Sequence, residues 1–146
     1  MAEGDGTVYN NFKEQVLAGT IDLSGDSTGH TLKLILVTGH SLDIDNDAAY
    51  SDVSGDECSG TGYSAGGETL TSQALTQDNT NDLAKFDADN VTWSSLDVSG
   101  GGDPNYAILY DDDADDCLIA AWEIATATNG GDWTIVWNAD GILTLS

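Results

Sequence analysis

The chain has 146 residues, which suits a single domain, and 40% of them are hydrophobic, which supplies a core. It carries 26 acidic side chains against three lysines and no arginine, so its formal net charge at pH 7 is −23. This charge excludes direct binding to the phosphate backbone of nucleic acids and docking on anionic lipid, because both need basic side chains. No apolar run is long enough for a membrane-spanning helix, and residues 1–8 lack the apolar segment of a secretory signal, so we expect synthesis in the cytoplasm and no membrane partner.

The charge also indicates the solvent to which the chain is adapted. Like charges at this density repel one another and destabilise a compact state in dilute buffer. The electrostatic screening length falls from about 10 Å at 0.1 M salt to about 3 Å at 1 M. Strong net charge can instead mean disorder, but apolar residues recur at strand spacing along most of the chain. We therefore predict a protein that folds in concentrated salt.

The first predicted element is a short helix over residues 8–17, where apolar side chains recur at helical spacing. Gly19 follows and can end that helix in a left-handed conformation. After a brief alternation at residues 20–23 comes the first strong strand, residues 32–37 (LKLILV). It is apolar at nearly every position, which is typical of a strand buried on both faces.

A polar stretch over residues 38–68 separates this strand from the next one. An unstructured loop of that length is rare in a compact domain. We therefore expect it to contain a helical turn at residues 44–50 and an ordered glycine- and serine-rich crossing at residues 59–67.

The remaining pattern is a series of short strands with turn residues between them. The Asn-Ala-Asp-Gly sequence at residues 138–141 predicts a hairpin whose two strands pair across it. The predicted fold is mainly β, an antiparallel β-sandwich of jelly-roll-like or barrel form with one short N-terminal helix. It spans residues 1–146 as one domain, with residues 1–7 as a flexible tail. The strands are expected at residues 69–76, 83–87, 89–93, 105–110, 117–123, 133–137 and 142–145.

The densest charge run follows the strand at residues 105–110 and is predicted to be an exposed hairpin loop. Five carboxylates within six residues repel one another unless water or cations surround them. Solvation alone is the simpler interpretation, and binding of Ca²⁺ or of monovalent cations is the alternative. The candidate metal ligands are Asp111, Asp112, Asp113, Asp115 and Asp116.

A second acidic pattern begins like a calcium-binding EF-hand loop. Asp43, Asp45 and Asp47 stand at alternate positions, as in the first half of that loop. The pattern then fails, because Ala48 stands where glycine is required and Ser54 where the bidentate glutamate is required. Two interpretations of this loop remain open: a cation site of another type, or a solvated loop without a bound ion.

The sequence carries no recognisable catalytic set, so we predict that the protein is not an enzyme. His30 and His40 flank the strand at residues 32–37, but no nucleophile motif lies beside either of them. The glycine runs lack the lysine of a phosphate-binding loop. Cys58 and Cys117 are expected to be two thiols, with a disulfide as the alternative. The tryptophans are expected in the core or at an interface, with a sugar-binding platform as the alternative: Trp93, Trp122, Trp133 and Trp137.

Three segments carry a resemblance to a known family. They are residues 59–67 (SGTGYSAGG), residues 86–93 (FDADNVTW) and residues 132–145 (DWTIVWNADGILTL). With the rest of the chain, they resemble a family of small virion structural proteins of tailed bacteriophages and related prophages. The sequence departs from that family in its charge, because aspartate stands where mixed lysine, arginine and aspartate would be expected. This departure suggests a tailed virus of a halophilic host, an archaeon or a bacterium.

The resemblance implies a non-enzymatic virion component that works as a symmetric homo-oligomer and contacts the major capsid protein or other virion proteins. Two placements are expected: a capsid decoration or turret subunit, and, as the alternative, a tail- or baseplate-associated protein. A host-surface module that binds glycans with Ca²⁺ is the second alternative. Large aromatic side chains usually anchor symmetric interfaces. The candidate interface or core positions are Phe12, Tyr106, Tyr110 and Trp122.

Overall fold

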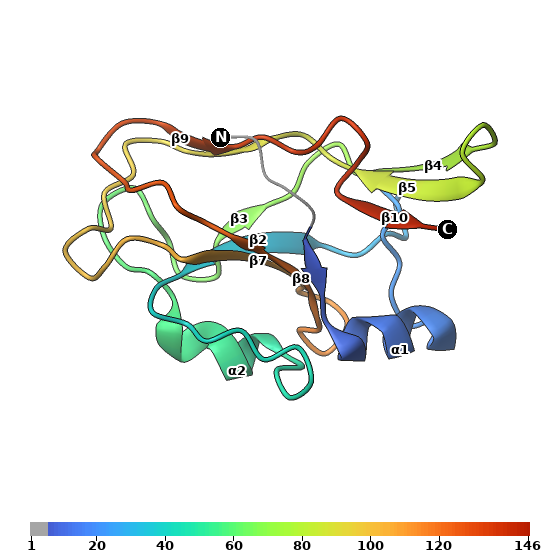
Figure 1. The fold of residues 1–146 in the computed structure, drawn as a ribbon, viewed down its shortest axis with the longest axis horizontal. Helices are drawn as coiled ribbons and strands as arrows, with labels where there is room; N and C mark the ends of the chain where they lie inside the picture. The colour runs from blue at the N-terminus through green and yellow to red at the C-terminus, as the bar shows by residue number, and fades with distance from the viewer. Residues whose placement is uncertain (1–5) are drawn as a thin grey trace.

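A computed structural model describes residues 6–146 of the chain and shows a layered, mainly β fold. A five-stranded antiparallel sheet forms the middle layer, two short helices lie on one of its faces, and two smaller sheets lie on the other (Figure 1). The helices are α1 (Asn10–Ala18) and α2 (Tyr50–Val53), and a 3₁₀ turn at Ser54–Asp56 follows α2. The strands are β1 (Thr7–Val8), β2 (Leu32–Val37), β3 (Glu68–Thr69), β4 (Ala74–Asp78), β5 (Leu83–Asp87), β6 (Val91–Trp93), β7 (Tyr106–Asp111), β8 (Leu118–Glu123), β9 (Trp133–Ile135) and β10 (Leu143–Leu145).

The central sheet has the order β1-β8-β7-β2-β3, and every neighbouring pair in it is antiparallel. Both of its faces are covered, so β2, β7 and β8 are apolar on both sides. Alternate side chains of a strand point to opposite faces. Leu34 and Leu36 accordingly enter one core cluster, whereas Ile35 and Val37 enter the other.

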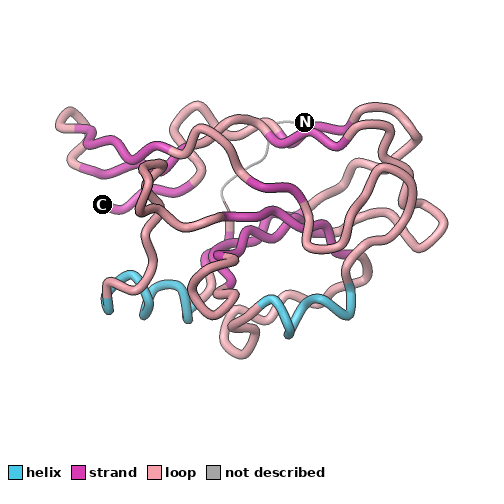
Figure 2. Tube along the Cα trace, turned by 180° about the vertical axis from the view of Figure 1, so that it is seen from behind, coloured by secondary structure: helices cyan, strands magenta, loops and turns pink. Residues whose placement is uncertain are grey.

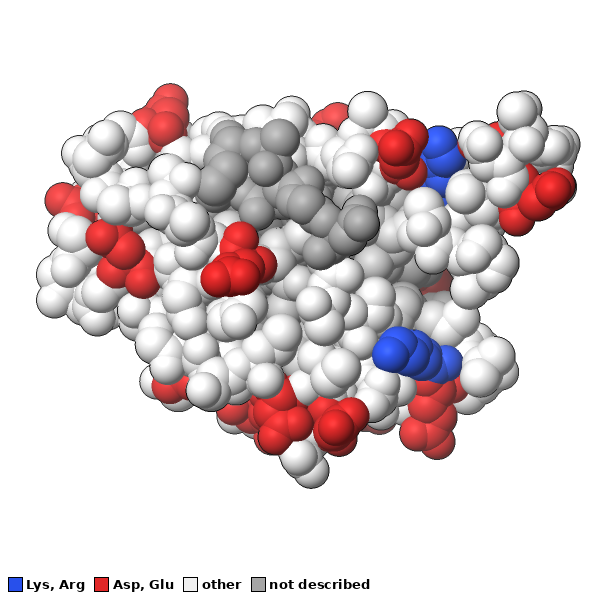
Figure 3. Space-filling view, in the orientation of Figure 1, with Lys and Arg blue, Asp and Glu red and all other residues white. Residues whose placement is uncertain are grey.

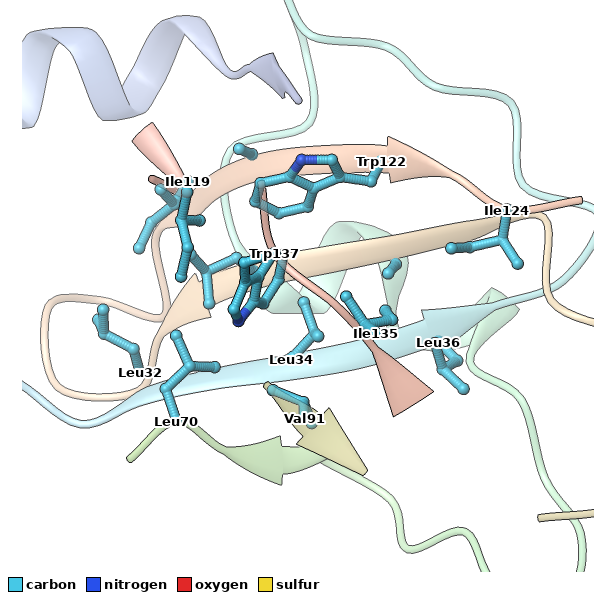
Figure 4. Close-up of a cluster of buried hydrophobic side chains, with 14 of the residues drawn as sticks. Leu32, Leu34, Leu36, Leu70, Val91, Ile119, Trp122, Ile124, Ile135 and Trp137 are labelled. Carbon is cyan, nitrogen blue, oxygen red and sulfur yellow. The ribbon is translucent and has the colours of Figure 1, made fainter. Parts of the chain in front are cut away.

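The larger core cluster lies between the central sheet and the two small sheets, which have the orders β6-β9 and β10-β5-β4. Figure 4 shows Leu32, Leu34 and Leu36 of β2 facing Val91 and Ile135 of the β6–β9 pair. Strands stacked in two layers in this way make a sandwich, which confirms the predicted fold class. The layers do not close, so the barrel form is not adopted.

The smaller core cluster lies beneath the two helices, on the other face of the central sheet. It joins Tyr9, Val53, Ile108 and Leu118, all of them fully buried. Figure 2 shows both helices on this side, well away from the small sheets. The helices and the loop that joins β2 to α2 therefore cover this face of the sheet.

The N-terminal helix is confirmed but starts two residues later than predicted. Val8 belongs to β1, which pairs with β8, and the helix begins at Asn10. Gly19 ends it with φ of 70°, as predicted. Only Phe12 of the predicted apolar stripe is buried, and Leu17 is 90% exposed. Residues 1–5 of the predicted flexible tail lie outside the described residues, and Thr7 is in a strand.

Two other predictions of secondary structure are met only in part. The helical turn expected at residues 44–50 is present only at the two ends of that range: the Asp47 N–H donates to the Asp43 carbonyl across a turn at residues 44–46, and α2 begins at Tyr50. The strand expected at residues 69–76 is split into β3 and β4, because Ser72 between them has φ of 56°, a left-handed conformation outside the extended β region.

The C-terminal strand does not pair across the Asn-Ala-Asp-Gly turn. β10 pairs with β5, while β9 pairs with β6. The connection is redirected because the indole N–H of Trp137 donates to the Asp89 carbonyl, and the Ile142 N–H donates to the Phe86 carbonyl. The chain therefore passes from one small sheet to the other between β9 and β10.

Candidate functional site

The acidic loop at residues 111–116 joins β7 to β8 and is tied down at its first residue. The Asp111 side chain is fully buried, although its charge would be expected in solvent. One of its carboxylate oxygens accepts the backbone N–H groups of Asp113 (2.9 Å) and Ala114 (3.0 Å). The other oxygen lies 2.6 Å from Nδ1 of His30. Asp111 thus organises the turn from inside.

The next carboxylates of this loop have separate partners. Asp112 lies 2.7 Å from the Lys33 ammonium, and Asp113 accepts the Thr31 N–H at 2.6 Å. Asp115 and Asp116 hold left-handed conformations and face solvent. Among the described residues, no group of three or more histidine, cysteine or acidic side chains is placed to hold a metal ion. The sequence-predicted cation ligands are therefore neighbours in the chain that do not converge on one point.

His30 lies against the buried carboxylate of Asp111. The hydrogen bond to Asp111 raises the pKa of His30 above its usual value, and the nearby Asp113 and Asp22 carboxylates add to the effect. The backbone N–H of His30 donates to the Asp22 carbonyl at 2.9 Å, and its own carbonyl accepts the side-chain amide of Gln73 at 3.3 Å. The pair can hold a proton, and it clamps two segments that are 81 positions apart.

His40 is buried between two carboxylates on the helical side of the sheet. Its Nδ1 lies 2.8 Å from Asp56, and its Nε2 lies 3.4 Å from Asp47. Neither Nε2 nor the buried hydroxyl of Tyr9 has a hydrogen-bond partner among the residues that the structure describes. Asp43, Asp45 and Asp47, which match the start of a calcium-binding EF-hand loop, belong to the same loop as His40. There the Asp43 side chain accepts the backbone N–H groups of Asp45 and Asn46.

A polar cluster that the sequence analysis did not identify lies at Glu57. Its carboxylate accepts the hydroxyl of Tyr50 at 2.6 Å, the hydroxyl of Tyr63 at 2.7 Å and the backbone N–H of Gly66 at 2.7 Å. The ring of Tyr50 stacks on Tyr110 at 5.0 Å between centroids. These contacts fix the crossing at residues 59–67 to the central sheet.

Tyr63 completes this cluster by connecting it to the backbone of β2. Its hydroxyl accepts the Leu36 N–H at 3.1 Å while it donates to Glu57. Burial is the main cause that raises the pKa of Tyr63 far above its ordinary value. The hydrogen bond to Glu57 raises the pKa of Tyr50 to about 12. The sequence offers one weak signal for this cluster: Glu57 is one of only five glutamates among the 26 acidic residues.

Three of the four predicted interface or core positions are buried, and one is partly exposed. Phe12, Tyr110 and Trp122 are buried inside the chain, which is the core alternative, so they cannot serve as an interface in this fold. Tyr106 is partly exposed and packs edge-on against His40.

All four tryptophans are buried, which excludes them as an exposed platform for sugars. Trp93 contacts Trp133 with ring centroids 5.7 Å apart, and Trp122 contacts Trp137 at 5.1 Å, as Figure 4 shows for the second pair. The least buried of them, Trp133, is 8% exposed. They are core anchors of the two-layer packing.

Both cysteines are free thiols and buried, as predicted. Burial raises the pKa of Cys58 to about 12 and that of Cys117 to about 11. Thiols of such high pKa are poor nucleophiles at neutral pH, because the thiolate is the reactive species.

Acidic side chains are scattered over the surface, and Figure 3 shows them as separate patches across the visible face, with lysine atoms beside some of them on the right. A groove of about 490 Å³ lies between β10 and the N-terminal strand. Val8, Leu83 and Ile142 provide apolar parts of its wall, and Lys85 and Asp140 provide charged parts. None of the described residues that line this groove is a histidine or a cysteine.

Comparisons with known proteins assign no family to this chain. Models of protein families, curated proteins and solved structures all give no match to this chain. No helix in the described part of the chain has the length and apolar character needed to span a membrane.

Proposed function

We propose that the chain is a structural subunit of a tailed virus particle from a high-salt environment. In this proposal it is a capsid decoration or turret subunit that forms symmetric oligomers on the shell and contacts the major capsid protein. It is made in the host cytoplasm and resides in the virion. The observation that carries the proposal is a net charge of −23 on a two-layer β-sandwich with a large, closely packed core.

The roles of the polar side chains support a mechanical function. Asp111, Asp43 and Asp78 accept N–H groups of their own turns. Glu57 holds the glycine-rich crossing, and His30 joins two loops. These groups hold the fold together, and a particle subunit that must survive in brine needs such internal ties.

The segments that resemble the virion family also lie together in the fold. The Tyr63 ring stacks near Trp93, and Trp93 pairs with Trp133 across the β6–β9 ladder. The Thr61–Asp97 bridge adds a backbone contact between the first segment and the chain that follows the second. Residues 59–67, 86–93 and 132–145 thus lie close together in the sandwich.

The tail or baseplate placement is the near variant of this proposal. The glycan-binding alternative receives no support, because its premise was exposed tryptophan together with Ca²⁺ held at residues 111–116. The tryptophans are in the core, and the carboxylates of that loop have separate partners.

Mass spectrometry of particles purified in molar KCl tests the proposal. The chain should co-purify with the shell in a fixed ratio to the major capsid protein, and that ratio should persist through repeated density gradients. A fixed but very small ratio would place it on the tail. Its absence from washed particles, or a ratio that varies between preparations, would refute a virion role.

A further inference from the structure

The C-terminal strand β10 is an open edge of the small sheet. The sheet has the order β10-β5-β4, and the described residues give β10 only β5 as a neighbour. Figure 1 shows β10 at the periphery of the molecule with the C-terminus beyond it. The groove beside it, lined in part by Leu143 and Thr144, leaves the strand accessible to solvent. An edge strand presents unpaired N–H and C=O groups that can accept another strand.

This edge is a strand of only three residues, but it lacks the side-chain features that normally prevent such pairing. Natural proteins protect edges with charged residues, proline or bulges. Residues 142–146 (ILTLS) contain no charged residue and no proline, and Leu145 is 69% exposed. The opposite edge, β4, is also uncharged from Ala74 to Gln77 and ends at Asp78, and Asp78 and Asp82 line a pocket together with Leu145. β4 is therefore the competing edge, and β10 differs from it in its more exposed leucine.

The charge of the chain decides which partner fits this strip. Two copies that each carry −23 can approach closely only where neither presents carboxylates. The five uncharged residues of β10 and its ends form such a strip, and an exposed leucine within it gains from burial. We propose that β10 pairs with β10 of a second copy, joining two small sheets into one continuous sheet.

The register of this pairing follows from two-fold symmetry. A two-fold interface places the same surface of both copies together. With the axis at Thr144, Leu143 of one copy faces Leu145 of the other, and Thr144 faces its own counterpart. The existing ladder puts Phe86 and Ala84 on the same face as these leucines. The joined sheet therefore has a continuous apolar row on one face, with no carboxylate opposite another.

The inference stands apart from the proposed function, because it concerns the free chain and is tested without particles. Sedimentation equilibrium or light scattering in about 3 M KCl, where the screening length is below about 3 Å, measures the mass across a dilution series. We expect twice the 15.2 kDa of one chain at the concentrated end. A single-chain mass at every concentration would overturn the inference, as would a higher closed oligomer that Leu145 variants leave intact.

Two variants of Leu145 separate strand packing from overall charge. Leu145→Asp and Leu145→Lys both remove the apolar contact, and we expect both to raise the dissociation constant about tenfold or more. If only the aspartate variant dissociated, general repulsion would be the cause and the strand pairing would be refuted.

The matched control is Leu75→Asp, on the same face of the same sheet but on β4, the other edge. Leu75 is 54% exposed, so the change in charge and in apolar area is similar. It should leave the two-chain mass unchanged, and dissociation by Leu75→Asp alone would move the interface to β4. Melting temperatures in the same KCl show that each variant folds, and Leu145→Thr supplies a strand-compatible version if either charged variant does not.

Discussion

Replacement of Glu57 by alanine should be one of the most destabilising single changes outside the apolar core. Its carboxylate accepts three hydrogen bonds, from Tyr50, Tyr63 and the Gly66 N–H, all between 2.6 and 2.7 Å. A hydrogen bond to a charged group contributes about 1.5–3 kcal/mol. The three share one acceptor and are therefore not additive. The Tyr50 hydroxyl can be resolvated near the surface, so we count the other two bonds.

The expected loss from Glu57→Ala is then about 3–5 kcal/mol of unfolding free energy. That is a large fraction of the roughly 5–15 kcal/mol that holds a typical domain folded. Glu57→Gln keeps an acceptor oxygen and the side-chain volume, so its cost should be only about 1–2 kcal/mol. Tyr50→Phe removes the single, partly exposed bond and should cost about 0.5–1.5 kcal/mol.

Urea unfolding at constant high KCl, followed by circular dichroism, gives these free energies. Titration of tyrosine absorbance provides a second measurement, because loss of the Glu57 carboxylate should lower the pKa of Tyr50 from about 12 towards its ordinary value. An alanine variant no less stable than Tyr50→Phe would refute the reasoning. So would an unchanged tyrosine titration in Glu57→Gln.

Three further outcomes are expected. The melting temperature should rise steadily from about 0.1 M to about 3 M KCl as the screening length shortens, and a flat profile in a KCl series would contradict adaptation to salt. The raised pKa of His30 means that its pairing with Asp111 stabilises the fold fully below the unfolded value and is lost as pH rises through the folded value. Urea midpoints of His30→Gln should therefore converge on the wild-type midpoints with rising pH, and a constant difference would exclude the linkage. Gly67→Ala should unfold much of the population, because a Cβ there would lie 2.0 Å from the Leu34 carbonyl at φ of 72°. Gly39→Ala, at φ of 64° with no atom within 4 Å, should cost only about 1 kcal/mol and serves as its control in thermal melts.

Hydrophobic pattern was enough to predict the central strands and the class of fold. The strand at residues 32–37 was predicted with the bounds that the structure shows, because a sheet covered on both faces leaves an unbroken apolar run. β5 was also predicted with its observed bounds. An apolar run is a local property of the sequence, so it can be recognised without knowledge of what covers the sheet.

Partners of strands and polar contacts depend on the path of the whole chain, and the sequence did not reveal them. β10 joins β5 because Trp137 and Ile142 bond to a segment about fifty positions earlier, which no turn motif records. Leu17 continues a helical stripe but is 90% exposed in the structure. Glu57 meets Tyr63 and Gly66 only after the crossing folds back, so its spacing carries no signal.

The carboxylates of the candidate cation loop lie apart for a different physical reason. Five neighbouring carboxylates suggest one binding centre when only their order is known. Asp111, however, ends a buried strand and turns inward, while Asp112 and Asp113 reach separate partners. Density of charge along the chain does not imply convergence in space.

The aspartates that cap their own turns have a consequence for how such a protein changes habitat. Asn129 and Asn138 accept N–H groups two positions onward, the same task that Asp26 and Asp97 perform elsewhere in the chain. An amide can therefore replace a carboxylate at these places while the turn survives. Adaptation of this fold to lower salt could therefore reduce the net charge one aspartate-to-asparagine exchange at a time, with each turn retained.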